Sequence, residues 1–165
     1  ARTLSVADTW VINTSPLILL GRINQLDLIS GLAQPLFIPE AVITELEAGR
    51  LKDGSAESTV SWARNFRSAM LPCPGSISSW ELGAGETQVL VCALEHHAWV
   101  VVDDLMARRC AKAHGIRVIG TLGICIRARK LGLIPKARPI LEQLRLNGLY
   151  FTDDLVDPIL AELSE

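Results

Sequence analysis

Apolar residues along this chain gather in four short runs, and between the runs they recur every three or four positions. The runs cover residues 9–12, 36–38, 99–102 and 116–119, and their β-branched and aromatic residues predict buried strands. Helices are predicted over residues 16–20, 26–32, 39–49, 55–69, 83–94, 105–114, 121–130, 135–147 and 154–163, with a connecting loop over 71–79. Strands that alternate with helices in this way predict a three-layer α/β/α domain with a central, mainly parallel sheet.

Length and composition narrow the class of protein. The chain has 165 residues, of which 49% are hydrophobic, and a formal charge of −2, so we expect a single globular domain over residues 1–165. The near-neutral charge excludes a uniformly basic nucleic-acid-binding surface, although it allows a local basic patch. The apolar runs are too short to cross a membrane, and no leader pattern for secretion precedes them. We therefore expect a cytoplasmic protein without membrane contact.

The cysteines and histidines allow two other kinds of site, for which the sequence gives only weak signals. No CxxC pair is present, so the four cysteines are expected to be reduced. Cys92 and His96, and also Cys110 and His114, are four residues apart and would share a helix face. That spacing allows a zinc site or a cysteine nucleophile, but the zinc signatures are absent. Small core cysteines are the stronger interpretation.

Carboxylates and one amide follow the predicted strands. Asn13 follows the first strand, and Asp103 and Asp104 follow the third. Glu86 lies at a predicted helix start, and Glu45 lies within the helix after the second strand. Open α/β sheets bind ligands beyond the carboxyl ends of their strands, so these oxygens are candidates to meet in one pocket. Clustered carboxylates favour a divalent cation such as Mg²⁺ or Mn²⁺, which supports hydrolysis of a phosphodiester in nucleic acid.

Each of these residues also has a structural interpretation. Asp103 and Asp104 would cap the helix that follows, and Glu86 would be favoured by the dipole of its own helix. Glu45 would be an exposed helix residue, and Asn13 would hold a turn. By spacing alone the set is a weak signal.

Four segments together resemble the PIN-domain superfamily. They are VINTSPLILLGR, IPEAVITELEAG, ELGAGETQVLVCAL and VVDDLMARRCAKAHGIRVIGTLGICIRARKLGLI, which span about residues 10–135. The most specific parts are the helix start at residues 83–86 and the DD-x3-R…GTLG block. The likeness is strongest to a prokaryotic nucleic-acid-binding branch near the toxin ribonucleases of the VapC type.

The resemblance implies a PIN-like fold and single-strand ribonuclease activity with Mg²⁺ or Mn²⁺. It places the acidic site on Glu45, Glu86, Asp103 and Asp104, with Asp104 favoured over its neighbour as the residue that faces the metal. In the family pattern the first metal-binding aspartate follows the first strand, and here that position is Asn13. An amide brings no negative charge, which weakens the expected metal affinity.

Several further residues are candidate substrate contacts. Thr14 and Ser15 match small hydroxyl positions beside the first acidic position, where they would orient Asn13 or a metal-bound water. Arg108 and Arg109 lie one to two turns beyond the acidic pair and would reach the phosphate or a metal ligand. Backbone N–H groups around Thr121, in the turn over residues 120–123, would hold an anion.

Charge is segregated near the end of the chain. Residues 127–145 contain six basic residues and one acidic residue, whereas five acidic and no basic residues follow from position 153. The basic stretch would attract phosphates, or it would be no more than a solvated helix face.

Two functions therefore remain. The first is a divalent-metal-dependent ribonuclease that acts on single-stranded RNA, for which the resemblance allows a role as the toxin of a toxin–antitoxin pair. The second is a PIN-like nucleic-acid- or protein-binding domain that has lost activity through Asn13. The resemblance also implies a cognate antitoxin and a homodimer, for which the helices predicted over residues 55–69 and 135–147 offer apolar faces.

Overall fold

The computed structural model describes residues 8–49 and 54–165 of the chain, and its centre is one parallel sheet. Five strands form this sheet: β1 (Asp8–Ile12), β2 (Ala33–Pro39), β3 (Arg67–Ser68), β4 (Trp99–Val101) and β5 (Val118–Ile119). Their order is β3-β2-β1-β4-β5, and every neighbouring pair is parallel. The two central neighbours, β1 and β4, align Trp10 with Trp99 and Ile12 with Val101.

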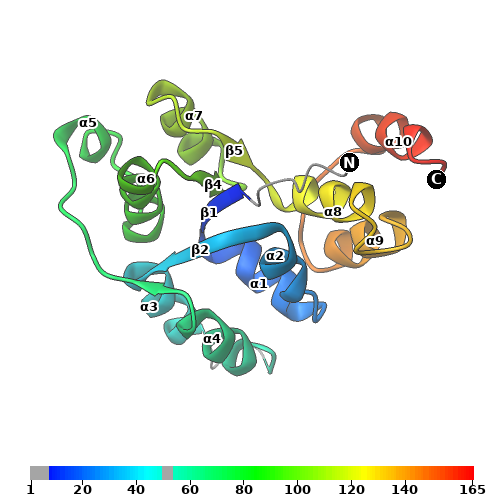
Figure 1. Ribbon diagram of the computed structural model, residues 1–165, viewed down its shortest axis with the longest axis horizontal. Coiled ribbons are helices and arrows are strands. Elements are labelled where there is room, and N and C mark those ends of the chain that lie inside the picture. The colour runs from blue at the N-terminus through cyan, green and yellow to red at the C-terminus, as the bar shows by residue number, and fades with distance from the viewer. Residues whose placement is uncertain (1–7, 50–53) are drawn as a thin grey trace, which may run out of the picture.

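Helices flank the sheet and connect its strands. They are α1 (Thr14–Arg22), α2 (Asp27–Leu32), α3 (Glu40–Gly49), α4 (Ala56–Arg64), α5 (Gly75–Ser78), α6 (Ala84–His96), α7 (Leu105–Ala113), α8 (Thr121–Lys130), α9 (Arg138–Leu146) and α10 (Asp153–Glu162). Helix α6 packs across β1, β2 and β4 and contacts α7, whereas α1 contacts α3, α4 and α8. Helices α6 and α7 lie on one side of the sheet and α1 and α4 on the other, α3 contacts both α1 and α6, and α8, α9 and α10 lie together at one end (Figure 1). The predicted α/β fold with a parallel sheet is confirmed.

Three local predictions need correction. The helix predicted over residues 55–69 ends at Arg64, and a two-residue strand, β3, follows it at the edge of the sheet. The acidic pair therefore follows the fourth strand rather than the third. The loop predicted over residues 71–79 contains the short helix α5. Helix α9 begins at Arg138, three residues after the helix start predicted at Pro135.

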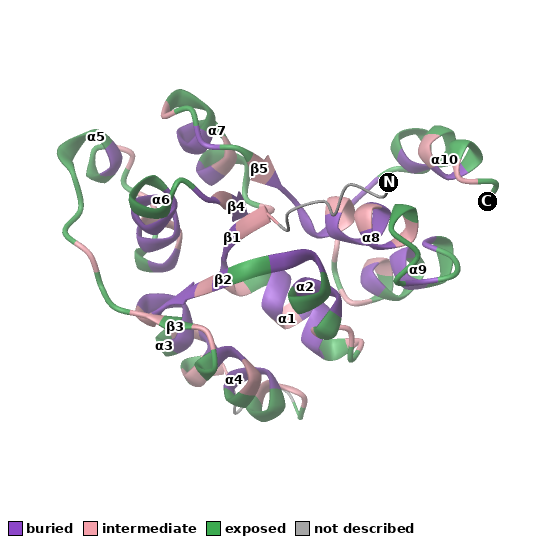
Figure 2. Cartoon of the chain, viewed as in Figure 1, coloured by how far each residue is buried: buried purple, intermediate pink, exposed green. Residues whose placement is uncertain are grey.

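The hydrophobic core lies along the central strands. Trp10, Val11 and Ile12 of β1 are fully buried, and so are Val100 and Val101 of β4. Burial on both faces explains why these strands read as continuous apolar runs without alternation. Figure 2 shows the buried residues along the strands and on the inward sides of the helices.

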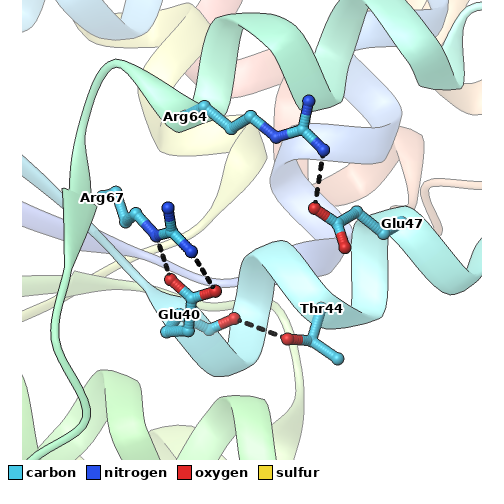
Figure 3. Close-up of polar contacts among 5 residues, drawn as sticks. All are labelled: Glu40, Thr44, Glu47, Arg64 and Arg67. Atoms are coloured by element: carbon cyan, nitrogen blue, oxygen red, sulfur yellow. Dashed lines mark hydrogen bonds and ion pairs between the residues drawn. The ribbon is translucent and has the colours of Figure 1, made fainter.

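Ion pairs join α3 to the segment that follows it (Figure 3). Glu40 accepts two hydrogen bonds from the guanidinium group of Arg67, one of them from Nη2 at 2.7 Å. These bonds hold the pKa of the Glu40 carboxyl below its usual value. Arg64 Nη2 donates to Glu47 Oε1 at 2.8 Å, about two turns further along α3. These ion pairs connect the edge strand β3 and the end of α4 to α3, the helix that carries Glu45.

Gly21 of α1 lies against Thr59 of α4. A Cβ on this residue would lie 2.1 Å from Thr59 Oγ1 and 3.3 Å from its Cβ. Thr59 is itself buried, so it has little room to turn away. We expect Gly21→Ala to lower the free energy of unfolding by about 1–3 kcal/mol in chemical denaturation, as overpacking of a core does.

Two variants check this cause. Nothing lies within 4 Å of a Cβ placed on Gly75, so Gly75→Ala should change stability by no more than about 0.5 kcal/mol. In a Thr59→Ala background, Gly21→Ala should cost less than it does alone. Equal losses in both backgrounds would mean that Thr59 is not the source of the effect.

Within the described residues, no helix is long and apolar enough to cross a membrane.

Candidate functional site

The strand register brings two candidate residues to the same edge of the sheet. The N–H of Asn13 donates to the carbonyl of Val101 at 3.0 Å, and the N–H of Val102 donates to that of Ile119 at 3.1 Å. These bonds continue the pairing beyond the carboxyl ends of β1, β4 and β5. Asn13 and Asp103 therefore follow neighbouring strands at the edge where α/β sheets bind ligands.

Asp103 is held by the start of α8. Its Oδ1 accepts the backbone N–H of Thr121 at 2.8 Å, and its Oδ2 accepts the Thr121 hydroxyl at 2.6 Å. A Cβ on Gly120 would lie 3.0 Å from Asp103 Oδ1 and 3.3 Å from Arg108 Nη1. The turn over residues 120–123, predicted to hold an external anion, thus binds the protein's own carboxylate. These contacts fix the direction of the Asp103 side chain.

Asp104 has a different role. It is exposed and is the N-cap of α7, where its Oδ2 accepts the N–H of Ala107 at 2.9 Å. The capping interpretation therefore applies to Asp104, and the expectation that Asp104 rather than Asp103 faces a metal finds no support in these contacts.

Glu45 connects three helices near the same edge. Its carboxylate accepts the hydroxyl of Thr14, the first residue of α1, at 2.5 Å and the N–H of Gly85 in α6 at 2.9 Å. A Cβ on Gly85 would lie 2.6 Å from both Glu45 oxygens, so only glycine leaves room for this carboxylate. Thr14 therefore orients Glu45, where the sequence predicted that it would orient Asn13.

Asn13 has the clearest unmet hydrogen-bonding potential. Its side chain is 4% exposed, and its Oδ1 has no hydrogen-bond partner among the described residues. It is the N-cap of α1, but its side chain makes no capping bond, so the turn-holding interpretation does not account for it. A buried amide oxygen without a donor is costly, and a cation would satisfy it.

Glu86 and the remaining candidates lie around these groups. Glu86 is half-buried in the first turn of α6, and its Oε2 lies 2.5 Å from the position of a Cβ on Gly83. Arg109 is exposed and contacts Met106, so of the two arginines it is Arg108 that approaches Asp103. Over residues 8–49 and 54–165, no three histidine, cysteine, aspartate or glutamate side chains gather closely enough to hold a metal ion.

A cavity of about 480 Å³ opens beside Asp103. Ser15, which the sequence predicts as a substrate contact, lines it together with Arg22 of α1. Its far wall is formed by residues 147–150, between α9 and α10. No local motif marks Arg22 or residues 147–150, because contacts between segments far apart in the sequence bring them to this cavity.

The basic stretch is largely paired with the acidic residues that follow it. Arg129 bonds to Glu165 at 3.2 Å, Arg138 pairs with Asp157 at 3.6 Å, and Arg145 bonds to Asp153 at 2.7 Å. Arg127 pairs with Asp8 and lies over the ring of Trp99, 4.5 Å from its centroid. These arginines make contacts within the domain, which leaves fewer free cations for a phosphate-binding patch.

The cysteines show no sign of activation. Cys110 Sγ lies 3.7 Å from His114 Nδ1, but that nitrogen is 2.8 Å from the Cys110 carbonyl oxygen. Burial raises the pKa of the Cys110 and Cys92 thiols. Burial, with the nearby charge of Asp103, raises the pKa of Cys125 to about 12. High thiol pKa values oppose both zinc binding and nucleophilic attack.

Comparison with known proteins identifies the family. The family model DUF3368, whose description is PIN domain, matches residues 9–165. A search of curated proteins finds no match. Among solved structures, PAE2754 from Pyrobaculum aerophilum is similar, with 16% identity and a TM-score of 0.49 over 70% of this chain and 92% of that one. VapBC-1 from nontypeable Haemophilus influenzae is also similar, with 12% identity and a TM-score of 0.47 over 68% of this chain and 98% of that one.

A family match over nearly the whole described chain establishes the class of protein. The chain belongs to the PIN-domain family, as the sequence resemblance predicted. PIN domains generally use divalent metal ions.

Proposed function

We propose that this chain is a PIN-type endoribonuclease that cleaves single-stranded RNA with the help of a divalent cation, Mg²⁺ or Mn²⁺. The site comprises Asn13 and Asp103 at the carboxyl ends of neighbouring strands, with Glu45 and Glu86 at its border. Asp104 contributes by capping α7, and Ser15 and Arg108 face the substrate side.

The observation that carries this proposal is the buried Oδ1 of Asn13. Among the described residues it has no donor, and it lies at the edge of the sheet where Asp103 is also held. Amide and carboxylate oxygens are the hard ligands that Mg²⁺ and Mn²⁺ prefer. The residues present therefore fit a divalent cation, although with fewer negative charges than a carboxylate trio would supply.

A bound divalent cation would activate water and neutralise charge that develops on a phosphodiester. The chain's own residues supply positioning. Thr121 and the start of α8 hold the Asp103 carboxylate, and Thr14 with Gly85 holds that of Glu45. Arg108 lies beside Asp103, where a guanidinium group would bind a phosphate oxygen.

Metal titration tests the role of Asn13. Asn13→Asp restores a charged ligand at the same size, so Mn²⁺ should bind this variant about tenfold or more tightly than the wild type, because affinity rises with ligand charge. Binding is measured by calorimetry and by the increase in thermal stability with Mn²⁺ concentration. RNA cleavage at low Mn²⁺ should rise in parallel.

Asn13→Ala is the matched control, because it removes the oxygen and adds no charge. It should bind Mn²⁺ more weakly than the wild type. If neither substitution changes the affinity for Mn²⁺, the metal lies elsewhere or is not bound, and the proposal fails.

A second function is favoured by two specific observations. Asn13 lacks the charge of an aspartate, and the Glu45 carboxylate is already engaged by two protein donors. A PIN domain with this site would bind nucleic acid or protein without cleaving it. RNA binding that is equal in Mn²⁺ and in EDTA, with no cleavage in either, would establish this function instead.

The family also predicts two kinds of binding partner for this chain, a cognate antitoxin and a second copy of the chain. Analytical ultracentrifugation of the purified chain tests whether it forms the homodimer.

A further inference from the structure

Residues 147–150, which line the cavity beside Asp103, include the single tyrosine of the sequence. Tyr150 is 88% exposed, although both of its neighbours in sequence are anchored. Leu149 packs against the core, and its N–H donates to the carbonyl of Leu144 at 3.0 Å. Phe151 is buried under the guanidinium of Arg145, whose Cζ lies 4.2 Å from the ring centroid. The backbone on both sides of the Tyr150 ring is therefore fixed.

The same segment is fastened to α1. Arg22 Nη1 donates to the carbonyl of Asn147 at 3.4 Å, across the cavity that both residues line. Gly148 adopts a φ of 107°, which a residue with a side chain rarely reaches. Its N–H donates to the backbone carbonyl of Arg145. This turn directs the chain so that Tyr150 emerges at the rim of the cavity beside Asp103 and Ser15.

Tyr150 lines two cavities. Tyr150 lines the cavity of about 480 Å³ that contains Asp103, and it also lines a second one of about 380 Å³ that reaches Asp153. A neutral aromatic ring on a fixed backbone, with open space beside it, is suited to stack on a planar ligand. Nucleobases are such ligands, and stacking on aromatic side chains tolerates any base.

We propose that Tyr150 is the base-binding residue of this site, and that its ring stacks on a nucleobase of an RNA strand that enters the cavity lined by Asp103. This inference rests on the proposed function, because it takes single-stranded RNA as the ligand. The wall formed by residues 147–150 is then part of the substrate-binding surface.

Binding of a hexauridine labelled with fluorescein tests the proposal, measured by anisotropy with the full chain. Ca²⁺ replaces Mn²⁺ in the buffer, and a gel confirms that the RNA stays intact. Tyr150→Ala should weaken binding at least about fivefold, and Tyr150→Phe, which keeps the ring, should bind like the wild type. Leu146→Ala is the matched control, because Leu146 is 87% exposed nearby but does not line the cavity. It should also bind like the wild type.

A second measurement reports on the ring itself. Because the sequence contains one tyrosine, 3-fluorotyrosine gives a single ¹⁹F resonance. Hexauridine should shift this resonance, and an abasic hexamer with the same phosphates should not.

Three other outcomes would contradict the inference, and each identifies a different error in it. If the wild type binds hexauridine and Tyr150→Ala binds it equally, the stacking role is wrong and the proposed function stands. Equal ¹⁹F shifts with both hexamers would show that the ring senses the backbone rather than a base. If the wild type binds neither hexamer, the inference and the RNA-binding function fail together.

Discussion

Asp103→Asn should reduce RNA cleavage at least about a hundredfold, as loss of a charge that stabilises the reacting centre does in other enzymes. The variant keeps the shape of the side chain and an acceptor for the Thr121 N–H, so the contact between β4 and α8 should persist. What it removes is the negative charge beside the cavity. Initial rates with a labelled single-stranded RNA in Mn²⁺ measure the effect, and thermal unfolding confirms that the variant folds.

Asp104→Asn is the matched control for this result. Asparagine caps helices about as well as aspartate, so α7 should be retained and cleavage should change little. The two variants differ by one position and carry the same chemical change. Equal losses of activity, or a larger loss for Asp104→Asn, would place the metal-facing carboxylate on Asp104 and contradict the assignment.

A thiol reagent such as DTNB should modify one cysteine of the native chain rapidly, and that cysteine should be Cys73. Cys73 is exposed, whereas Cys92, Cys110 and Cys125 are buried. With a pKa of about 12, the thiolate fraction of Cys125 near pH 8 is about a thousandfold smaller than that of an ordinary thiol. Raising the pH toward 12 should increase its reactivity only as the thiolate forms.

The Cys73→Ser variant removes the rapid phase if this assignment is correct. All of the remaining thiols should then react only after denaturation in guanidinium. Rapid reaction of a second thiol in the native chain would contradict the burial of the other three. If that thiol were Cys110, a cysteine nucleophile assisted by His114 would have to be reconsidered.

The fold was predictable because its central strands have an unusually plain signal. Residues buried on both faces of a parallel sheet form uninterrupted apolar runs, as the runs around Val11 and Val100 do. Strand β3 was missed because Arg67 and Ser68 are polar and pair with β2 on one side only. An edge strand of this length leaves no periodicity to detect.

The site was predictable in outline but not in detail. The topological rule for ligand sites directs attention to Asn13 and to the acidic pair, and the structure places Asn13 and Asp103 at the same edge of the sheet. It could not predict the different contacts of Asp103 and Asp104, because those of Asp103 depend on Thr121, a residue 18 positions later. Local sequence patterns likewise did not predict that residues 147–150 would line the cavity.

The pairing of Arg129, Arg138 and Arg145 with acidic partners affects how the molecule meets a polyanion. Opposite charges at contact distance cancel each other's field within a few ångströms, so this end of the domain projects little potential into solution. The proposed RNA ligand would therefore gain little long-range steering from this end, and few counterions would leave its backbone on docking there. We expect its binding to depend on short-range contact and to persist at ionic strengths that dissociate strongly basic proteins from nucleic acid.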